Sequence, residues 1–429
     1  MYESEERDRR RNSALLGVDY VVFWVAMAFL GPMTVLPTFV RLLGGSQVAV
    51  GSLGTIMTGG WLLPQLLAGR HVVGRPLVKR HVLVPAYAGR LLLLMLVPTL
   101  LWLAPRAAYL ALAALLLSYL GFTVGDALST VAWLELLGKT VPAERRGRYM
   151  GLLQALGSFL AIGAGMLVRA ILARSAPFLA NHLLLILTAA ILFVLGTTAT
   201  ALVREPSGAS SGKPQPGWRD YLPRLASIMR TDRRFAWLVV VRWLAALGDM
   251  GAAFYVLYAV DRLAIAPEMA GLFISAGVAG SLFSGVCLGF LADRRGSAQV
   301  IRVIVALRCV CPVLVLAAPL VARLHPSLGL WTMASVFFVG GVANGGYMVG
   351  FTNLLLQIAP PAERTTYVAL ANTLGGLVTA APMVAGQLLE ATSYEFLFVV
   401  LGMAALSLLA AFREPREAPV APALTGAEP

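Results

Sequence analysis

Pro142-Ala143-Glu144-Arg145 recurs later in the chain as Pro361-Ala362-Glu363-Arg364. Each copy follows one long apolar run and precedes another. Upstream of the two copies, polar positions also align when one residue of slippage is allowed: Asp126 with Asn344, and Glu135 with Asn353. A repeat of about half the chain is typical of membrane proteins that consist of two related bundles. The sequence therefore predicts two halves that are related by pseudo-symmetry.

The composition assigns both halves to a membrane. Of the 429 residues, 59% are apolar and 13% are charged, whereas a soluble chain carries about a quarter charged residues. Apolar runs of about 20 residues, enough for a helix to cross a bilayer, cover residues 16–42, 47–69, 81–104, 107–137, 148–171, 182–203, 236–261, 267–292, 298–322, 328–358, 365–390 and 394–412. We therefore predict an all-α integral membrane protein with 12 transmembrane helices in two pseudo-symmetric six-helix bundles.

These runs divide the chain into five segments. Residues 1–13 form a charged tail that we expect to be disordered, and residues 14–203 form the first bundle. The linker 204–235 begins with a stretch rich in Ser, Gly and Pro, and its part from Arg219 to Arg234 predicts an amphipathic helix on the membrane surface. Residues 236–412 form the second bundle, and residues 413–429 form a second disordered tail.

Positive charge is concentrated on one side of the predicted bundles. The two tails, the linker and the alternate loops near residues 70–80, 139–148, 294–302 and 364 hold 25 of the 34 Lys and Arg residues, and the opposite loops hold six. We call the first side the basic end. Because positive loops mark the cytoplasmic side, we expect both termini in the cytoplasm and the chain in the cytoplasmic membrane. This distribution explains the net charge of +13 through lipid contact, without nucleic acid, and we expect a monomer.

Motifs for chemistry are missing from the sequence. The three cysteines, Cys287, Cys309 and Cys311, lie in apolar runs, and the four histidines lie at or near loops. Neither set has the spacing of a metal site or of a disulfide framework. We therefore expect no enzyme activity, no catalytic residue, no metal and no cofactor.

The loop after the eighth run reads Gly289-Phe290-Leu291-Ala292-Asp293-Arg294-Arg295-Gly296. This stretch resembles the cytoplasmic-loop signature of the major facilitator superfamily, Gly-x-Leu-Ala-Asp-Arg-x-Gly. The resemblance covers nearly the whole chain and implies two bundles that rock around a midplane cavity. It also implies a cytoplasmic gate in which Gly289 allows close helix approach, Asp293 and Arg294 make charge contacts, and Gly296 permits a tight turn.

The equivalent loop of the first half departs from this signature, because Gly69 stands where the signature has Asp. Arg70 and Arg75 belong to this loop. We expect Glu135, at the inner end of the fourth run, to supply their negative partner; the alternative is a solvated carboxylate at a helix end.

The two Pro-Ala-Glu-Arg copies are expected to begin the fifth and eleventh helices, since Pro fits a first helical turn. Glu144 and Glu363 then lie at the positive end of a helix, beside Arg145 and Arg364. Two roles remain open for these residues: a helix start that anchors topology, or a part of the cytoplasmic gate.

Ionisable residues also lie deep inside the apolar runs: Arg90, Asp126, Arg242, Asp249 and Arg308. At 1.5 Å per residue, four of them lie about 15–22 Å from the basic end, and Arg242 is shallower. An ionised group at such depth costs several kcal/mol unless it is paired or hydrated. We therefore expect these side chains to face a central cavity or each other, with Asp126 paired to Arg90, and Asp249 paired to Arg242 or Arg308.

Two further features bear on the predicted cavity. Ala88-Gly89-Arg90 and Ala306-Leu307-Arg308 occupy equivalent positions of the repeat, and Gly31-Pro32 breaks the first run. Broken helices are common around the binding site of rocking transporters. Asn344, on the tenth run, is a weaker candidate for the cavity wall.

Three roles remain open for the deep charges. Asp126 or Asp249 takes up and releases a proton, the arginines bind an anionic substrate, or static ion pairs orient the helices. We predict a secondary active transporter that moves a small molecule by alternating access, with proton coupling through Asp126 or Asp249 as a hypothesis. The alternative is a non-transporting membrane sensor or partner subunit with the same fold. Because Asp126 and Glu135 align with neutral asparagines, we expect ion or substrate chemistry in the first half and the better-formed gate in the second.

Overall fold

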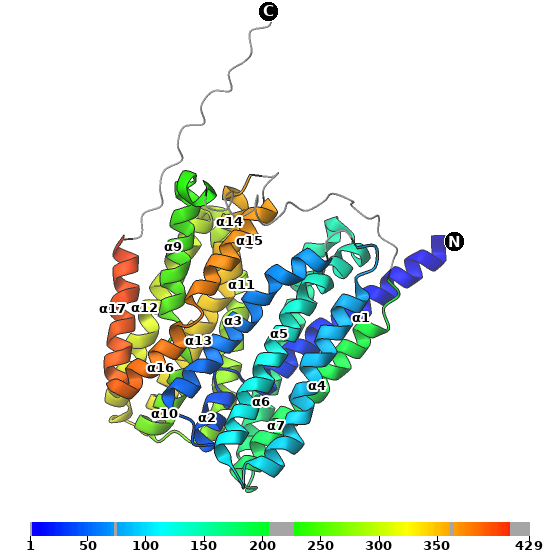
Figure 1. Cartoon of the computed structure of the whole chain (residues 1–429). Coiled ribbons are helices and arrows are strands. Elements are labelled where there is room, and N and C mark those ends of the chain that lie inside the picture. The colour runs from blue at the N-terminus through cyan, green and yellow to red at the C-terminus, as the bar shows by residue number, and fades with distance from the viewer. Residues whose placement is uncertain (1, 73–74, 206–226, 361–363, 412–429) are drawn as a thin grey trace, which may run out of the picture.

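The computed structural model describes residues 2–72, 75–205, 227–360 and 364–411 (Figure 1). The first half contains α1 (Tyr2–Leu30), α2 (Val35–Leu42), α3 (Gln47–Val72), α4 (Lys79–Leu103), α5 (Ala108–Thr140), α6 (Ala143–Leu172) and α7 (Phe178–Ala201). The second half contains α9 (Arg233–Gly248), α10 (Ala252–Leu263), η1 (Pro267–Met269), α11 (Ala270–Arg295), α12 (Ser297–Ala322), α13 (Pro326–Tyr347), η2 (Met348–Thr352), α14 (Asn353–Ile358), α15 (Arg364–Gly375), η3 (Gly376–Val378), α16 (Ala381–Ala391) and α17 (Tyr394–Ala411).

These helices group into the twelve predicted spans, and the all-α architecture of two bundles is confirmed. α1 and α2 form the first span, α9 and α10 the seventh, α13 and α14 the tenth, and α15 and α16 the eleventh. Within the described residues, nine helical stretches are long and apolar enough to cross a membrane. In Figure 1, α1 begins and α17 ends at the same, upper end of the molecule.

The first span of each half is broken near its middle. Gly31 ends α1 with a φ of +51°, a conformation that L side chains rarely adopt, and a Cβ there would collide with the side chain of Val35. The predicted break at Gly31-Pro32 is therefore present. The equivalent break in the seventh span separates α9 from α10 at residues 249–251.

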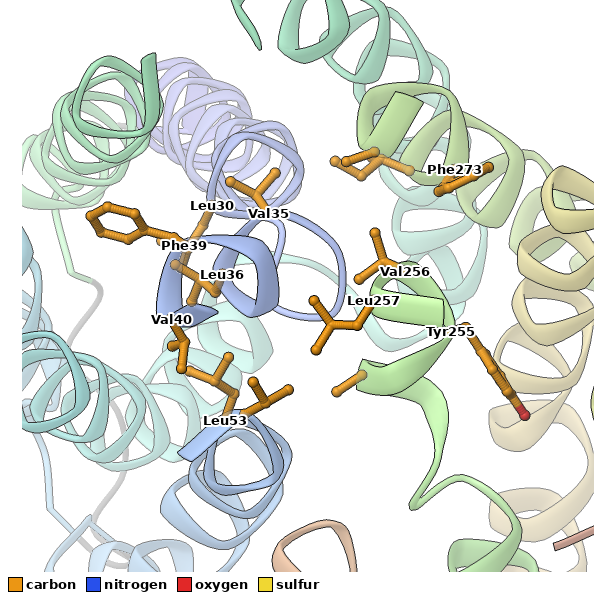
Figure 2. Close-up of a cluster of buried hydrophobic side chains, with 14 of the residues drawn as sticks. Leu30, Val35, Leu36, Phe39, Val40, Leu53, Tyr255, Val256, Leu257 and Phe273 are labelled. Carbon is orange, nitrogen blue, oxygen red and sulfur yellow. The ribbon is translucent and has the colours of Figure 1, made fainter. Parts of the chain in front are cut away.

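The two halves share one apolar core at the end of the molecule that contains α2 and α10, which we call the distal end (Figure 1). In Figure 2, Leu36 and Val40 on α2 lie on one side of this core, and Val256 and Leu257 on α10 lie on the other. Apolar area removed from water stabilises by roughly 25 cal/mol per Å². The distal core therefore holds the bundles together.

Close backbone contacts join the halves in the same region. A side chain at Gly271 on α11 would collide with the carbonyl oxygen of Gly165 on α6, and one at Gly51 on α3 would collide with the carbonyl oxygen of Pro382 on α16. The Ser275 hydroxyl donates a hydrogen bond to the Ile162 carbonyl oxygen over 2.8 Å. Small residues allow this approach of helices.

At the basic end each half has its own core. One buried cluster contains residues of the first half only, including Leu16, Leu136 and Val203. Another contains residues of the second half only, including Phe235, Ile301 and Leu354. Among the described residues, the halves are therefore packed together distally and have separate cores at the basic end.

The prediction of a disordered tail at residues 1–13 is wrong for the described residues, because α1 begins at Tyr2. Asn12 exchanges two hydrogen bonds with the backbone of Arg204, at 2.6 and 3.0 Å. The Tyr149 hydroxyl donates to the carbonyl oxygen of Ser13. These contacts with the end of the sixth span and with α6 keep a polar helix folded beyond the apolar run.

The start of the linker is fixed by Glu205. Its carboxylate accepts hydrogen bonds from the amides of Val78 and Lys79, at 2.7 and 2.8 Å, and pairs with the Lys139 ammonium at 2.9 Å. It thus caps the beginning of α4. Residues 206–226 and 412–429 lie outside the described chain, so the amphipathic helix and the second tail stay predictions.

Candidate substrate cavity

A cavity of about 360 Å³ lies between the halves. Its wall comes from α1, α3, α6, α9, α10, α11, α12 and α13 and from both helix breaks. Most of the lining is apolar or aromatic, and the members with large side chains are Trp24, Met27, Met33, Met57, Tyr255, Phe273, Ile274 and Phe337. Ligand sites are commonly concave and mostly apolar, with a few polar groups. The cavity therefore has the size and lining of a small-molecule site.

The break in the seventh span brings Asp249 to the cavity. Asp249 is the C-terminal cap of α9, and its carboxylate Oδ2 lies 2.6 Å from Nη2 of Arg308 on α12. The Asp249 side chain is 43% exposed, whereas that of Arg308 is 6% exposed. The Arg308 guanidinium also donates to the carbonyl oxygen of Ala245. Asp249 therefore presents its carboxylate to the cavity with the arginine buried behind it.

Arg242 does not take part in this pair. Its guanidinium donates to the Asn372 Oδ1 atom over 3.3 Å and lies 5.4 Å from the ring centroid of Tyr347. The structure thus selects Arg308 from the two predicted partners of Asp249. Asn344 is exposed and lines the cavity, as the sequence predicted.

The second predicted pair lies inside the first half, away from the cavity lining. Arg90 on α4 lies 3.9 Å from the Asp126 carboxylate on α5, and 3.5 Å from that of Asp19 on α1. The three side chains are 5%, 13% and 9% exposed, respectively. Arg90 also donates to the hydroxyl of Thr197 and to the carbonyl oxygen of Phe193. We call Arg90, Asp19 and Asp126 the first-half cluster.

Glycines bring this cluster together. Gly89 and Gly125, which precede Arg90 and Asp126, face each other so closely that a Cβ on Gly125 would lie 3.1 Å from the Gly89 Cα atom. Helices α4 and α5 therefore touch through their backbones, and the charged neighbours meet. Arg90 and Asp126 were expected to face the cavity or each other; they face each other, and neither is among the described lining residues.

Sequence reasoning missed Asp19. Its carboxylate accepts a hydrogen bond from the Thr200 hydroxyl over 3.0 Å in addition to its contact with Arg90. Asp19 lies eight residues after Arg11, a position that looks like a helix end when the apolar run is counted from residue 16. The available signal was the place of Asp19 inside the predicted apolar run 16–42, where an ionised group needs partners.

Polar contacts between the halves occur at the distal end. Arg41 on α2 lies 3.6 Å from the carboxylate of Asp261 on α10, which also accepts a hydrogen bond from the Tyr394 hydroxyl at 2.7 Å. The Glu390 carboxylate on α16 accepts a hydrogen bond from the amide of Val48, in the first turn of α3, over 3.1 Å. One half therefore caps a helix of the other.

Comparison with protein families agrees with this two-bundle geometry. The sequence profile of the Major Facilitator Superfamily matches residues 124–381 and 238–429. The chain belongs to this superfamily. A search of curated protein sequences found no match.

Solved structures of transporters share the major facilitator fold of this chain. A mutant of the nucleoside transporter NupG superposes with a TM-score of 0.72 at 14% identity, covering 93% of this chain and 98% of that one. A bacterial homologue of the iron transporter ferroportin in its inward-facing state superposes with a TM-score of 0.71 at 16% identity, covering 94% of this chain and 98% of that one. A bacterial ferroportin homologue in its outward-facing state superposes with a TM-score of 0.60 at 18% identity, covering 93% of this chain and 98% of that one.

The major facilitator signature of the second half lies at the end of α11. Asp293 and Arg294 are exposed, and the Arg294 guanidinium lies 4.9 Å from the ring centroid of Phe290. Gly296 has a φ of +79° and forms the turn into α12, so the predicted need for glycine at the turn is confirmed. The expected close approach at Gly289 is absent, because a Cβ there would meet nothing within 4 Å. The separate cores at the basic end explain this difference.

The remaining gate predictions stay untested. Glu135, Arg75 and Arg145 are exposed, and the side chains of Arg70, Glu144 and Arg364 lie outside the described part of the chain, as does Glu363. Pro142 is the N-terminal cap of α6, so the first Pro-Ala-Glu-Arg copy begins the fifth span as predicted.

Proposed function

We propose that this protein is a secondary active transporter that moves a small molecule across the cytoplasmic membrane by alternating access. The observation that carries the proposal is a cavity between two bundles that share a distal core and have separate cores at the basic end. Since the positive-inside rule assigns the basic end to the cytoplasm, the present conformation is inward-facing. The better superposition with the inward-facing ferroportin homologue supports this assignment.

Asp249 is the residue that we propose for proton coupling. Its carboxylate is exposed to the cavity, whereas Asp126 is enclosed among the helices of one bundle. A proton carrier must meet solvent from both sides in turn, and a cavity between rocking halves offers that exchange. The first-half cluster is then an ion pair that orients helices. Ion chemistry is thereby proposed for the second half, whereas the alignment of Asp126 and Glu135 with asparagines favoured the first.

The test begins with a search for a ligand. A compound that binds the folded state alone raises its stability, so purified protein would be heated with a panel of metabolites and drugs. A stabilising compound would then be tested for uptake into proteoliposomes with and without an imposed proton gradient. We expect accumulation against its gradient when the proton gradient is present. Binding without flux under any gradient would contradict transport and favour the sensor or partner-subunit alternative.

Alternating access has a test that requires no flux. Spin labels would be placed at the distal end through Arg41→Cys and Asp261→Cys, and at the basic end through Arg145→Cys and Arg294→Cys, after the native cysteines are replaced. On addition of a stabilising compound, we expect the distal distance to lengthen in part of the population while the basic-end distance shortens. If both distances keep a single unchanged distribution, alternating access is wrong.

A further inference from the structure

We infer that the cavity binds an organic cation with an apolar body, whose ammonium group contacts the free carboxylate oxygen of Asp249. This inference rests on the proposed function and specifies its substrate class. It follows from the distribution of charge, burial and apolar surface around the cavity.

Few charged side chains reach the cavity. Asp249 and Arg308 are the only charged side chains among the described lining residues. Arg308 is almost fully buried and is engaged by Asp249 and by the carbonyl oxygen of Ala245. The charge that a solute meets first is therefore the half-exposed carboxylate, and an anion would have to approach it.

One oxygen of the Asp249 carboxylate is available to a ligand. Arg308 contacts Oδ2 of Asp249, and no hydrogen bond from another described residue reaches Oδ1. A carboxylate accepts several hydrogen bonds, so an ammonium group can bind Oδ1 while Arg308 stays on Oδ2. The bound state keeps the ion pair and adds a charge-assisted hydrogen bond. No buried charge loses its partner during binding.

The rest of the cavity wall suits an apolar body of the solute. Trp24, Tyr255, Phe273 and Phe337 line the cavity together with the three methionines at positions 27, 33 and 57. Aromatic faces attract a cation within about 6 Å, and flexible thioethers adapt to varied apolar shapes. Polar lining groups are few, and they include Gln154, Ser158 and Ser281. This wall suits an apolar amine better than a sugar or a nucleotide, whose many hydroxyl or phosphate groups would lack partners.

The experiment compares three probes of matched shape: diphenylpropylamine, diphenylpropanol and diphenylpropanoate. Their dissociation constants would be measured by titration calorimetry on the full chain in lipid nanodiscs at neutral pH. We expect the amine to bind about tenfold more tightly than the alcohol, as a charged hydrogen bond implies, and the acid to bind more weakly still. Equal or tighter binding of the alcohol or the acid would overturn the inference.

Variants assign the preference to Asp249. In Asp249→Asn, the amine is expected to fall to the affinity of the alcohol, and the alcohol should bind as before. Because this change leaves Arg308 buried without a counter-ion, the double variant Asp249→Asn with Arg308→Met removes both charges and keeps the test possible. Glu395→Gln removes a carboxylate that is paired with Arg262 outside the cavity lining, and it should preserve the amine preference. An amine preference that survives both Asp249 variants would refute the assignment.

Failure of this inference is distinguishable from failure of transport. If the amine binds through Asp249 but no probe crosses proteoliposome membranes under any gradient, the cation site stands and the transport proposal fails. If the protein moves a neutral or anionic compound and ignores the amine, transport stands and the cation site is wrong.

Discussion

Arg90 and Arg308 occupy equivalent positions in the two halves, and each contacts an aspartate from the first span of its own half. Arg90 lies among Asp19, Asp126 and the α7 backbone, where all three charged side chains are nearly buried. Arg308 lies behind Asp249, whose carboxylate is 43% exposed in the cavity. One repeated arginine thus lies inside a sealed bundle and the other lies behind a carboxylate of the cavity wall. An equivalent position of the arginine in the repeat therefore does not determine whether solvent reaches the carboxylate that it contacts.

The largest expected effect concerns the loss of each arginine. Arg90→Met leaves two carboxylates buried without their cation, and removing one partner of a buried pair costs about 3–5 kcal/mol. Arg308→Met leaves Asp249 with access to cavity water, so its cost should be about 1 kcal/mol, the upper range for ion pairs that solvent reaches. Thermal unfolding of both variants in the same detergent measures the contrast. Equal destabilisation would show that the Asp249–Arg308 pair is as buried as the first-half cluster.

The next effect concerns transport. For a compound that wild-type protein accumulates, Asp249→Asn should lower proton-driven uptake by about tenfold or more, equivalent to about 1.4 kcal/mol, because an amide cannot take up and release a proton. Asp126→Asn should retain proton-driven uptake in the fraction of protein that folds, because its carboxyl group is enclosed in one bundle. Initial rates in proteoliposomes, normalised to folded protein, measure both. The reverse result would return the coupling role to the first half.

A smaller loss of stability than that of Arg90→Met concerns the hydrogen bonds of the first-half cluster. Thr200→Val removes the hydroxyl that donates to Asp19 Oδ2, and a lost bond to a buried charged group costs about 1.5–3 kcal/mol. The matched change Ser281→Ala, at a polar residue in the cavity wall, should stay within about 0.5 kcal/mol, as surface-like positions do. Unfolding midpoints compare the two. If Ser281→Ala destabilised the protein as much as Thr200→Val, the cavity wall would be as sealed from water as the first-half cluster.

Much of the fold was predictable because membrane helices follow local rules. Apolar length, positive loops and the Pro-Ala-Glu-Arg repeat specify twelve spans in two halves without knowledge of contacts. The pairing of Arg90 with Asp126 was also predictable, since deep charges seek partners. Asp19 was missed because its depth depends on where α1 begins, and α1 continues to Tyr2 through contacts of Asn12 with the end of the sixth span.

The identity of the residues at the cavity was less predictable. Sequence distance gives depth along a helix but does not give the direction in which that helix faces in a bundle. That direction depends on packing, such as the backbone contact of Gly89 with Gly125, which encloses Arg90 and Asp126. It also depends on the break between α9 and α10, which brings Asp249 to the cavity and selects Arg308 over Arg242 as its partner.

By itself the sequence determined a membrane protein of twelve helices in two related halves, and it supplied charges that had to be paired. These properties follow from hydropathy and electrostatics along a single chain. Only the tertiary structure decided which carboxylates are enclosed in a bundle, which carboxylate reaches the cavity and at which end the halves meet. A charged side chain is stable either among protein partners or beside water, so the sequence alone does not choose between the two. The rotation and close contact of helices that are distant in sequence make that choice.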